Sequence, residues 1–145
     1  MRTNEAAWET RYVLDACALI TLLNREQGYE KINGLLMLAQ SQEVSVCMNV
    51  VNLLEVYYDR IRVCGQKRAD VFLETIYNSD IEILEQQNKA ILKNAGILKA
   101  NYKMSLADAF ALATAIYKRA TIITSDHHEF DVIEQKENIK FLWIR

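Results

Sequence analysis

The sequence contains no proline, only four glycines and three cysteines in 145 residues. Average usage would give about 7 prolines and about 10 glycines, so collagen-like, proline-rich and glycine-rich linker sequences are excluded. The number of cysteines is odd, and their spacing fits neither a C-x-x-C motif nor a zinc-ligand pattern. We therefore interpret them as small apolar core residues in a reducing compartment, which predicts a cytoplasmic protein.

Long apolar runs are also missing. No run approaches about 18 residues, and the first eleven residues are polar, so neither a membrane span nor a signal peptide is expected. Apolar residues make up 51% of the chain, and a chain of this length buries about 70% of its unfolded surface without needing a disulfide or a structural metal. We expect a single domain over residues 1–145, with residues 1–10 as a loosely ordered leader.

Short runs rich in Val, Ile or Thr alternate with longer segments of helical periodicity. Five strands are predicted at residues 11–14, 44–48, 81–84, 121–124 and 139–143. Six helices are predicted at residues 17–23, 29–40, 50–63, 66–77, 87–101 and 106–119. This alternation predicts an α/β sandwich around a mostly parallel sheet. Ligands of such sheets bind outside the carboxyl ends of the strands, so the chemistry is expected there.

Acidic residues occur at these strand ends. Asp15 directly follows the first predicted strand, and Asp126 closes the fourth. Asp108 lies in the first turn of the helix at 106–119, where the helix dipole stabilises a carboxylate. Glu55 lies on the helix that directly follows the second strand and therefore starts at the same edge of the sheet. The four carboxylates could converge.

Each of these acids also has an ordinary structural interpretation. Asp15 could cap the helix that begins near it, and Asp126 could form an Asx turn. Ser105 and Asp108 satisfy the capping-box pattern, in which the pair serves only backbone amides. Glu55 belongs to a polar stripe that could be a solvated helix face. Taken one at a time, the residues leave these alternatives open.

A cluster of four carboxylates has a specific chemical consequence. Two carboxylates about 4 Å apart repel each other by roughly 4 kcal/mol at an effective dielectric constant of 20. The cluster must therefore hold protons or bind a cation. A ligand set made only of oxygen favours Mg²⁺ or Mn²⁺ over zinc. Such an ion can activate water and stabilise the charge that develops on a phosphodiester.

At these residues the sequence resembles the PIN-domain ribonucleases, and in particular the VapC-type toxins of prokaryotic toxin–antitoxin pairs. The matching segments, in the order of the family, are residues 12–19, 52–58, 106–113 and 123–130. The resemblance implies a three-layer α/β/α sandwich with a mostly parallel central sheet, usually as a homodimer.

The resemblance also implies an activity. Asp15, Glu55, Asp108 and Asp126 would be the acidic quartet that holds Mg²⁺ or Mn²⁺ and hydrolyses RNA to a 3′-hydroxyl and a 5′-phosphate. A VapC-like protein further implies a small antitoxin that inserts a peptide segment near the active site.

The sequence departs from the family pattern at two places. The position two after the first aspartate, often a hydroxyl or amide residue in the family, is Cys17. Asp131 is close enough in sequence to Asp126 to rival it as the fourth ligand, although Asp126 lies nearer the strand end and is preferred. We interpret His127 and His128 as turn residues of a loop.

Basic residues cluster around a predicted turn at Gly65. Four of them fall within nine positions: Arg60, Arg62, Lys67 and Arg68. Such a cluster can bind RNA phosphates without reading the base sequence. It can equally be a solvated corner between two helices, because Asp59 and Asp70 flank it. The sequence leaves both interpretations open.

The sequence therefore predicts a Mg²⁺- or Mn²⁺-dependent endoribonuclease. The alternative is a PIN-like module that binds RNA or protein without catalysis. Phosphotransfer at Asp15 fits less well, because the dehalogenase pattern needs a second aspartate at the place of Cys17. The formal net charge of −2 does not exclude RNA, because the chain without the four acids has a net charge of +2.

Overall fold

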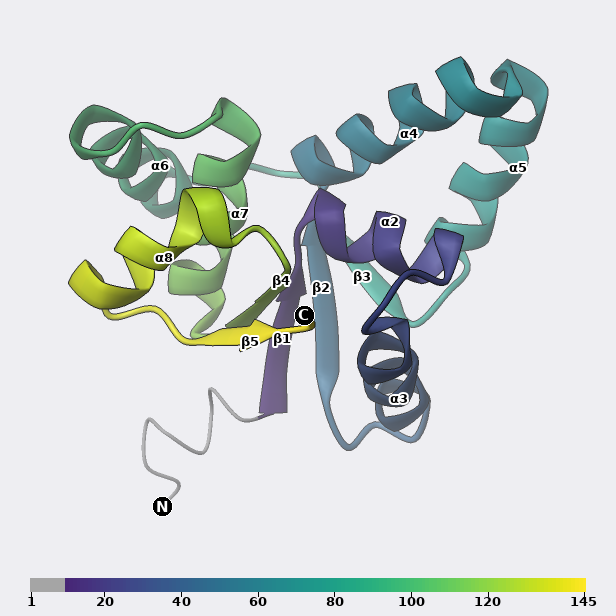
Figure 1. The fold of residues 1–145 in the computed structure, drawn as a ribbon, viewed down its shortest axis with the longest axis horizontal. Coiled ribbons are helices and arrows are strands. Elements are labelled where there is room, and N and C mark those ends of the chain that lie inside the picture. The colour runs from purple at the N-terminus through teal and green to yellow at the C-terminus, as the bar shows by residue number, and fades with distance from the viewer. Residues whose placement is uncertain (1–9) are drawn as a thin grey trace.

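The computed structural model describes residues 10–145, which form five strands and seven helices around one sheet (Figure 1). The strands are β1 (Arg11–Leu14), β2 (Ser45–Asn49), β3 (Ile81–Leu84), β4 (Thr121–Thr124) and β5 (Phe141–Trp143). The helices are α2 (Ala16–Asn24), α3 (Tyr29–Gln40), α4 (Val50–Cys64), α5 (Gln66–Tyr77), α6 (Lys89–Asn101), α7 (Leu106–Lys118) and α8 (His127–Lys136). Apart from Thr10, the predicted leader lies outside the described residues.

The sheet is parallel throughout its five strands, in the order β3-β2-β1-β4-β5. The central strand β1 pairs with β2 through Val13 and Cys47, and with β4 through Val13 and Ile122. Because all strands run the same way, their carboxyl ends lie along one edge. The chain leaves β1, β2 and β4 at this edge and enters α2, α4 and α8 almost at once.

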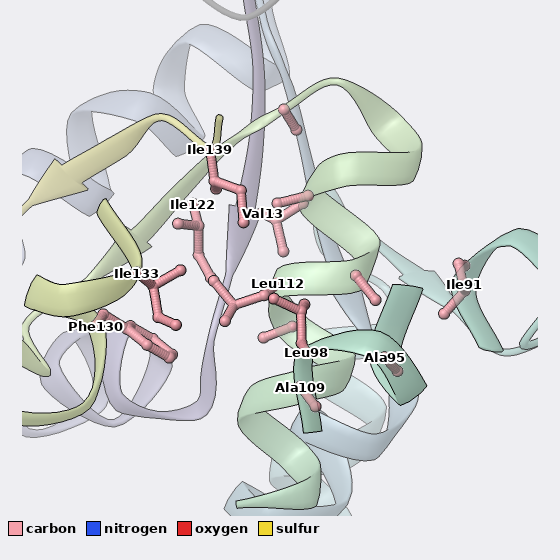
Figure 2. Close-up of a cluster of buried hydrophobic side chains, with 14 of the residues drawn as sticks. Val13, Ile91, Ala95, Leu98, Ala109, Leu112, Ile122, Phe130, Ile133 and Ile139 are labelled. Atoms are coloured by element: carbon pink, nitrogen blue, oxygen red, sulfur yellow. The ribbon is translucent and has the colours of Figure 1, made fainter. Parts of the chain in front are cut away.

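Successive strand residues pack into two separate cores on the two faces of the sheet. Val13 and Ile122 belong to the core that lies under α6, α7 and α8 (Figure 2). Their neighbours Leu14 and Ile123 belong to the core that lies under α2, α3, α4 and α5. All four of these side chains are fully buried. Helices therefore cover both faces of the sheet, which confirms the predicted three-layer α/β/α sandwich.

All five predicted strands and all six predicted helices are present, with bounds that differ by at most two residues, but helix α8 was not predicted. The strands at residues 11–14, 81–84 and 121–124 and the helices at residues 29–40 and 66–77 have the predicted bounds. The interpretation of His127 and His128 as loop residues is wrong, because they begin α8 with Asp126 as its N-cap. Within residues 10–145, no helix is long and apolar enough to cross a membrane.

Candidate active site

Asp15 stands between β1 and α2 and is buried, with 2% of its surface exposed. Its carboxylate caps α2 by accepting a hydrogen bond of 2.7 Å from the backbone N–H of Ala18. Burial raises the pKa of Asp15 to about 7, against the lowering effect of hydrogen bonds from the Thr124 hydroxyl and the Ala18 amide. The charges of Asp108 and Asp126 contribute to this rise in pKa. Asp15 therefore caps a helix and also lies in the field of two other acids.

Asp126 follows β4 and caps α8, accepting a hydrogen bond of 3.3 Å from the backbone N–H of Glu129. Its own backbone N–H donates to the buried Thr124 hydroxyl at 3.0 Å. Because the Thr124 hydroxyl also hydrogen-bonds the Asp15 carboxylate, one side chain of β4 ties the two strand-end acids together. The Asp131 carboxylate instead forms a hydrogen bond of 2.8 Å with Nδ1 of His127.

Asp108 lies in the first turn of α7, where its backbone N–H donates to the Ser105 hydroxyl at 3.1 Å. The capping interaction is therefore present. Burial raises the pKa of Asp108, hydrogen bonding with Ser105 lowers it, and the charges of Asp126 and Glu129 raise it. Glu129 is an acid of this region that the sequence motifs did not identify.

Glu55 lies on α4 and is half-buried, which does not fit a fully solvated helix face. Burial raises its pKa, the charge of Asp108 raises it further, and the neighbouring Asn52 lowers it. The structure thus brings the four predicted acids into one electrostatic group, in which Asp108 interacts with each of the other three. We call these four acids, together with Glu129, the acidic edge.

Buried amides join the helices that carry the acids, and sequence reasoning missed them. Asn52 is fully buried and donates from Nδ2 to the carbonyl of Ala107 at 3.0 Å, which holds α4 against the start of α7. Asn49 caps α4 and donates to the Thr114 hydroxyl on α7 at 2.9 Å. The sequence did contain one signal for Asn49: an asparagine between a strand and a helix is typical of an N-cap.

The donor set of the acidic edge fits an oxygen-preferring divalent cation. Within residues 10–145, no three His, Cys, Asp or Glu side chains lie close enough to hold one ion. Mg²⁺ does not require a closed cage, because it keeps several waters and binds through one or two carboxylates. The mutual repulsion of the acids favours a cation. The Oδ1 atom of Asn52 is buried without a hydrogen-bond partner, as expected where a donor such as water belongs.

Cys17, the departure from the family pattern, lies in the first turn of α2. Its Sγ atom hydrogen-bonds the Ser125 hydroxyl at 2.6 Å, which joins α2 to the segment after β4. Burial raises the pKa of the Cys17 thiol, and the charge of Asp15 raises it further. The thiol is therefore held in its neutral form beside Asp15.

The basic residues at the α4–α5 turn lie away from these acids. We call Arg60, Arg62, Lys67 and Arg68 the basic corner. Ten helical residues separate Glu55 from the turn at Gly65, which is about 15 Å along α4. The Arg60 side chain is 18% exposed and lies 3.4 Å from Asp59, while Arg62 lies over the ring of Tyr58, 4.9 Å from its centroid.

Known proteins share this architecture. The profile of the PIN domain family matches residues 12–136, a range that includes all four predicted acids. VapBC-1 from nontypeable Haemophilus influenzae has a TM-score of 0.70 and 19% identity, over 92% of this chain and 98% of that chain. DNA-bound VapBC from Salmonella typhimurium has a TM-score of 0.70 and 16% identity, over 93% and 98%.

A third similar structure is VapC20 from Mycobacterium tuberculosis, described as a sarcin-ricin loop cleaving toxin. Its TM-score is 0.60 and its identity 15%, over 83% of this chain and 94% of that chain. None of the curated proteins matches the sequence significantly. At these identities, the solved structures establish a common fold.

Proposed function

The chain belongs to the PIN domain family, and we propose that it is a metal-dependent endoribonuclease acting as the toxin of a type II toxin–antitoxin pair. The observation that carries the proposal is the acidic edge: at the carboxyl ends of a parallel sheet, burial and the charges of neighbouring acids raise the pKa values of Asp15, Glu55 and Asp108. A desolvated, mutually repelling group of acids is costly for folding. Such a group of acids is expected at a site that binds a cation and a phosphate.

Asp15, Glu55, Asp108 and Asp126 are proposed to hold Mg²⁺ or Mn²⁺. When bound, the ion supplies an electrophile that neutralises the charge growing on the phosphate and lowers the pKa of a water molecule. The chain's own residues fix the positions. Thr124 holds Asp15 and Asp126, and the Asp15 and Asp126 carboxylates are also fixed as the N-caps of α2 and α8. Ser105 hydrogen-bonds both the backbone N–H and the side chain of Asp108.

The proposed reaction is hydrolysis of an RNA phosphodiester. A water oxygen bonds to phosphorus, the bond from phosphorus to O3′ breaks, and O3′ takes a proton. The products are a 3′-hydroxyl and a 5′-phosphate. Asn52 contributes by joining α4 to the first turn of α7, which fixes Glu55 relative to Asp108.

The test is cleavage of single-stranded RNA by the purified protein with Mg²⁺ or Mn²⁺, and its loss on addition of EDTA. Asp108→Asn removes the charge but keeps the backbone N–H that donates to Ser105, so the helix should remain capped. We expect Asp108→Asn to be inactive. A preparation of Asp108→Asn made in parallel also measures contaminating nuclease. Cleavage at the wild-type rate by this variant would reject the catalytic assignment.

A second candidate function is a non-catalytic module that binds RNA or protein. It is favoured by the finding that no three candidate ligands within residues 10–145 lie close enough to hold one ion. Titration calorimetry with Mn²⁺ separates the two functions. The nuclease predicts binding that Asp108→Asn weakens, whereas the module predicts no specific binding and no cleavage.

The proposed partner is an antitoxin, because similar solved structures include a toxin–antitoxin complex from Klebsiella pneumoniae and VapBC-5 from Mycobacterium tuberculosis, a member of the VapBC family of toxin–antitoxin systems. An apolar groove between α4 and α5 offers a surface for an antitoxin segment. Its lining residues are Val50, Leu53, Leu54, Tyr57, Leu73 and Tyr77, and Leu54 and Tyr77 are among the exposed large apolar side chains. Leu54→Asp should abolish co-purification with the product of the neighbouring reading frame, whereas Leu92→Asp on α6 should not.

The proposal includes two further properties of the protein, a cytoplasmic location and a homodimer. Sedimentation velocity of the purified chain would measure the dimer directly, since a protein of 16.8 kDa would sediment as one of twice that mass.

A further inference from the structure

A row of aromatic rings runs from the core to the surface between β5 and α8. The buried Phe130 packs against Phe141 with 5.8 Å between ring centroids. Phe141 stacks on Trp143 at 5.3 Å and an interplanar angle of 9°. Trp143 stacks on His127 at 3.8 Å and 14°. The row ends at His127, whose side chain is 48% exposed.

The ring of His127 is fixed on one face and at both nitrogens. Nδ1 lies 2.8 Å from the Asp131 carboxylate, and Nε2 lies 2.8 Å from the backbone carbonyl of Arg145. The guanidinium of Arg145 is itself held by the Glu26 carboxylate at 3.1 Å and the Gln27 carbonyl at 3.0 Å. The exposed part of His127 is therefore the ring face opposite Trp143, together with the carbon edge.

His127 directly follows Asp126, the N-cap of α8, so the Cα atoms of the two residues are about 3.8 Å apart and His127 adjoins the acidic edge. Its nitrogens already contact acceptor oxygens, so they are not available to donate to a phosphate. Asp131 and Glu134 surround the row, with Glu134 accepting from the Trp143 indole at 2.9 Å. An anionic group is disfavoured among these acids, whereas a flat neutral ring is not.

We propose that the outer face of His127 is a stacking platform for an unpaired nucleobase of the RNA substrate, an inference that rests on the proposed function. Every nucleobase has a π-face, and stacking on an aromatic side chain is a common mode of single-strand recognition. The nucleotide whose base stacks there has its backbone beside Asp126. The platform therefore selects single-stranded over paired RNA at the position of cleavage.

The test measures RNA binding without cleavage, in the Asp108→Asn background. The probe is a fluorescein-labelled oligoadenylate of about 12 nucleotides, followed by fluorescence anisotropy. His127→Ala should weaken binding about tenfold, and His127→Phe, which keeps a flat ring, should stay within about threefold. His128→Ala, at the adjacent exposed histidine, is the matched control and should have no effect.

Duplex RNA provides a second comparison, because its bases are not free to stack on a side chain. We expect His127→Ala to leave duplex binding unchanged. Equal losses for His127→Ala and His127→Phe, in proteins with unchanged thermal unfolding, would overturn the platform and assign His127 to holding the C-terminal segment. Unchanged oligoadenylate binding by His127→Ala would overturn it as well.

Failure of the platform and failure of the proposed function give different results. If wild-type protein cleaves RNA with Mg²⁺ but His127→Ala binds oligoadenylate normally, only the platform is wrong. If neither wild-type protein nor Asp108→Asn binds or cleaves any RNA, both proposals are rejected. In active protein, the platform predicts that His127→Ala raises KM for single-stranded RNA by about tenfold, with a smaller effect on kcat.

Discussion

The acidic edge and the basic corner both concentrate charge, but the chain assembles them differently. The four predicted acids come from four segments between Asp15 and Asp126 and meet because parallel strands end at one edge. The basic corner comes from nine consecutive positions around one turn. Burial and mutual repulsion raise the pKa values of Asp15, Glu55 and Asp108. At the basic corner, Arg60 instead forms an ion pair with Asp59, and the guanidinium of Arg62 lies over the ring of Tyr58.

This difference indicates where function constrains the sequence. Exposed charges at a corner are screened by salt and contribute little to folding. Desolvated carboxylates without a cation oppose folding, so their retention needs another reason. Large effects of substitution are therefore expected at the acidic edge and small ones at the basic corner.

The largest difference is expected between Asp126 and Asp131, the two rivals for the fourth acid. Asp126 raises the pKa values of Asp15 and Asp108, whereas Asp131 contacts His127. Asp126→Asn keeps a side-chain oxygen to cap α8 and should reduce the RNA cleavage rate about 1,000-fold, or about 4 kcal/mol. Asp131→Asn should reduce it less than about tenfold. The reverse order in a single-turnover assay would exchange the two assignments.

The second prediction concerns the stability of the metal-free protein. Asp15 has a pKa of about 7 in the folded protein, against an ordinary value of 3.8. Because the folded state holds the proton more tightly, this contribution to stability is complete below the lower pKa and is lost as the pH rises towards the higher one. Asp15→Asn carries no such proton and keeps the oxygen that caps α2.

We therefore expect Asp15→Asn to gain about 2–3 kcal/mol relative to wild type between about pH 5 and about pH 8. The measurement is urea unfolding in EDTA at both pH values. Asp59→Asn beside the basic corner, where the carboxylate is partly exposed, is the control for the general effect of removing one acidic charge. A difference between wild type and Asp15→Asn that stays constant with pH would contradict the burial of a carboxylate beside two other acids.

The third prediction tests the amide that joins two parts of the acidic edge. Asn52→Ala leaves the carbonyl of Ala107 without its buried donor, which should cost about 1–2 kcal/mol of unfolding free energy. It should also lower cleavage by displacing Glu55 relative to Asp108. Asn101→Ala, at an exposed asparagine of α6, should change stability by less than about 0.5 kcal/mol. Loss of stability with full activity would make Asn52 purely structural.

Most of the fold could be predicted because its strands are short, β-branched and separated by clear helical patterns. Three strands and two helices have the bounds that periodicity predicts. The helix α8 was missed because its ten residues begin with two histidines and have a weak apolar pattern. One local and one tertiary interaction fix this helix: Asp126 caps its start, and Phe130 and Ile133 fill the core on one face of the sheet.

The sheet topology predicted which acids of the candidate site lie near one another, but not the side chains that hold them in place. The rule that parallel strands end at one edge brings Asp15 and Asp126 together. Neither the Thr124 hydroxyl that links them nor the fully buried state of Asn52 is visible in the sequence. Capping and active-site roles looked like alternatives for Asp15, whereas its carboxylate caps α2 and also interacts with two other acids. A helix start offers N–H groups and a positive dipole end that suit both.

The smallest effect is expected at the basic corner, where Lys67 and Arg68 are exposed and are proposed to contact RNA phosphates. Replacing both by glutamine should weaken binding of single-stranded RNA about threefold. It should also reduce the slope of log affinity against log salt by about 1.4, since each phosphate contact contributes about 0.7. Glutamine at both Lys89 and Lys93 on α6 makes the same change of net charge at another exposed surface and should leave the slope nearly unchanged. Equal slopes for the two double variants would mean that only the net charge matters and that the basic corner makes no specific phosphate contacts. RNA affinity would then depend on the acidic edge and its bound cation.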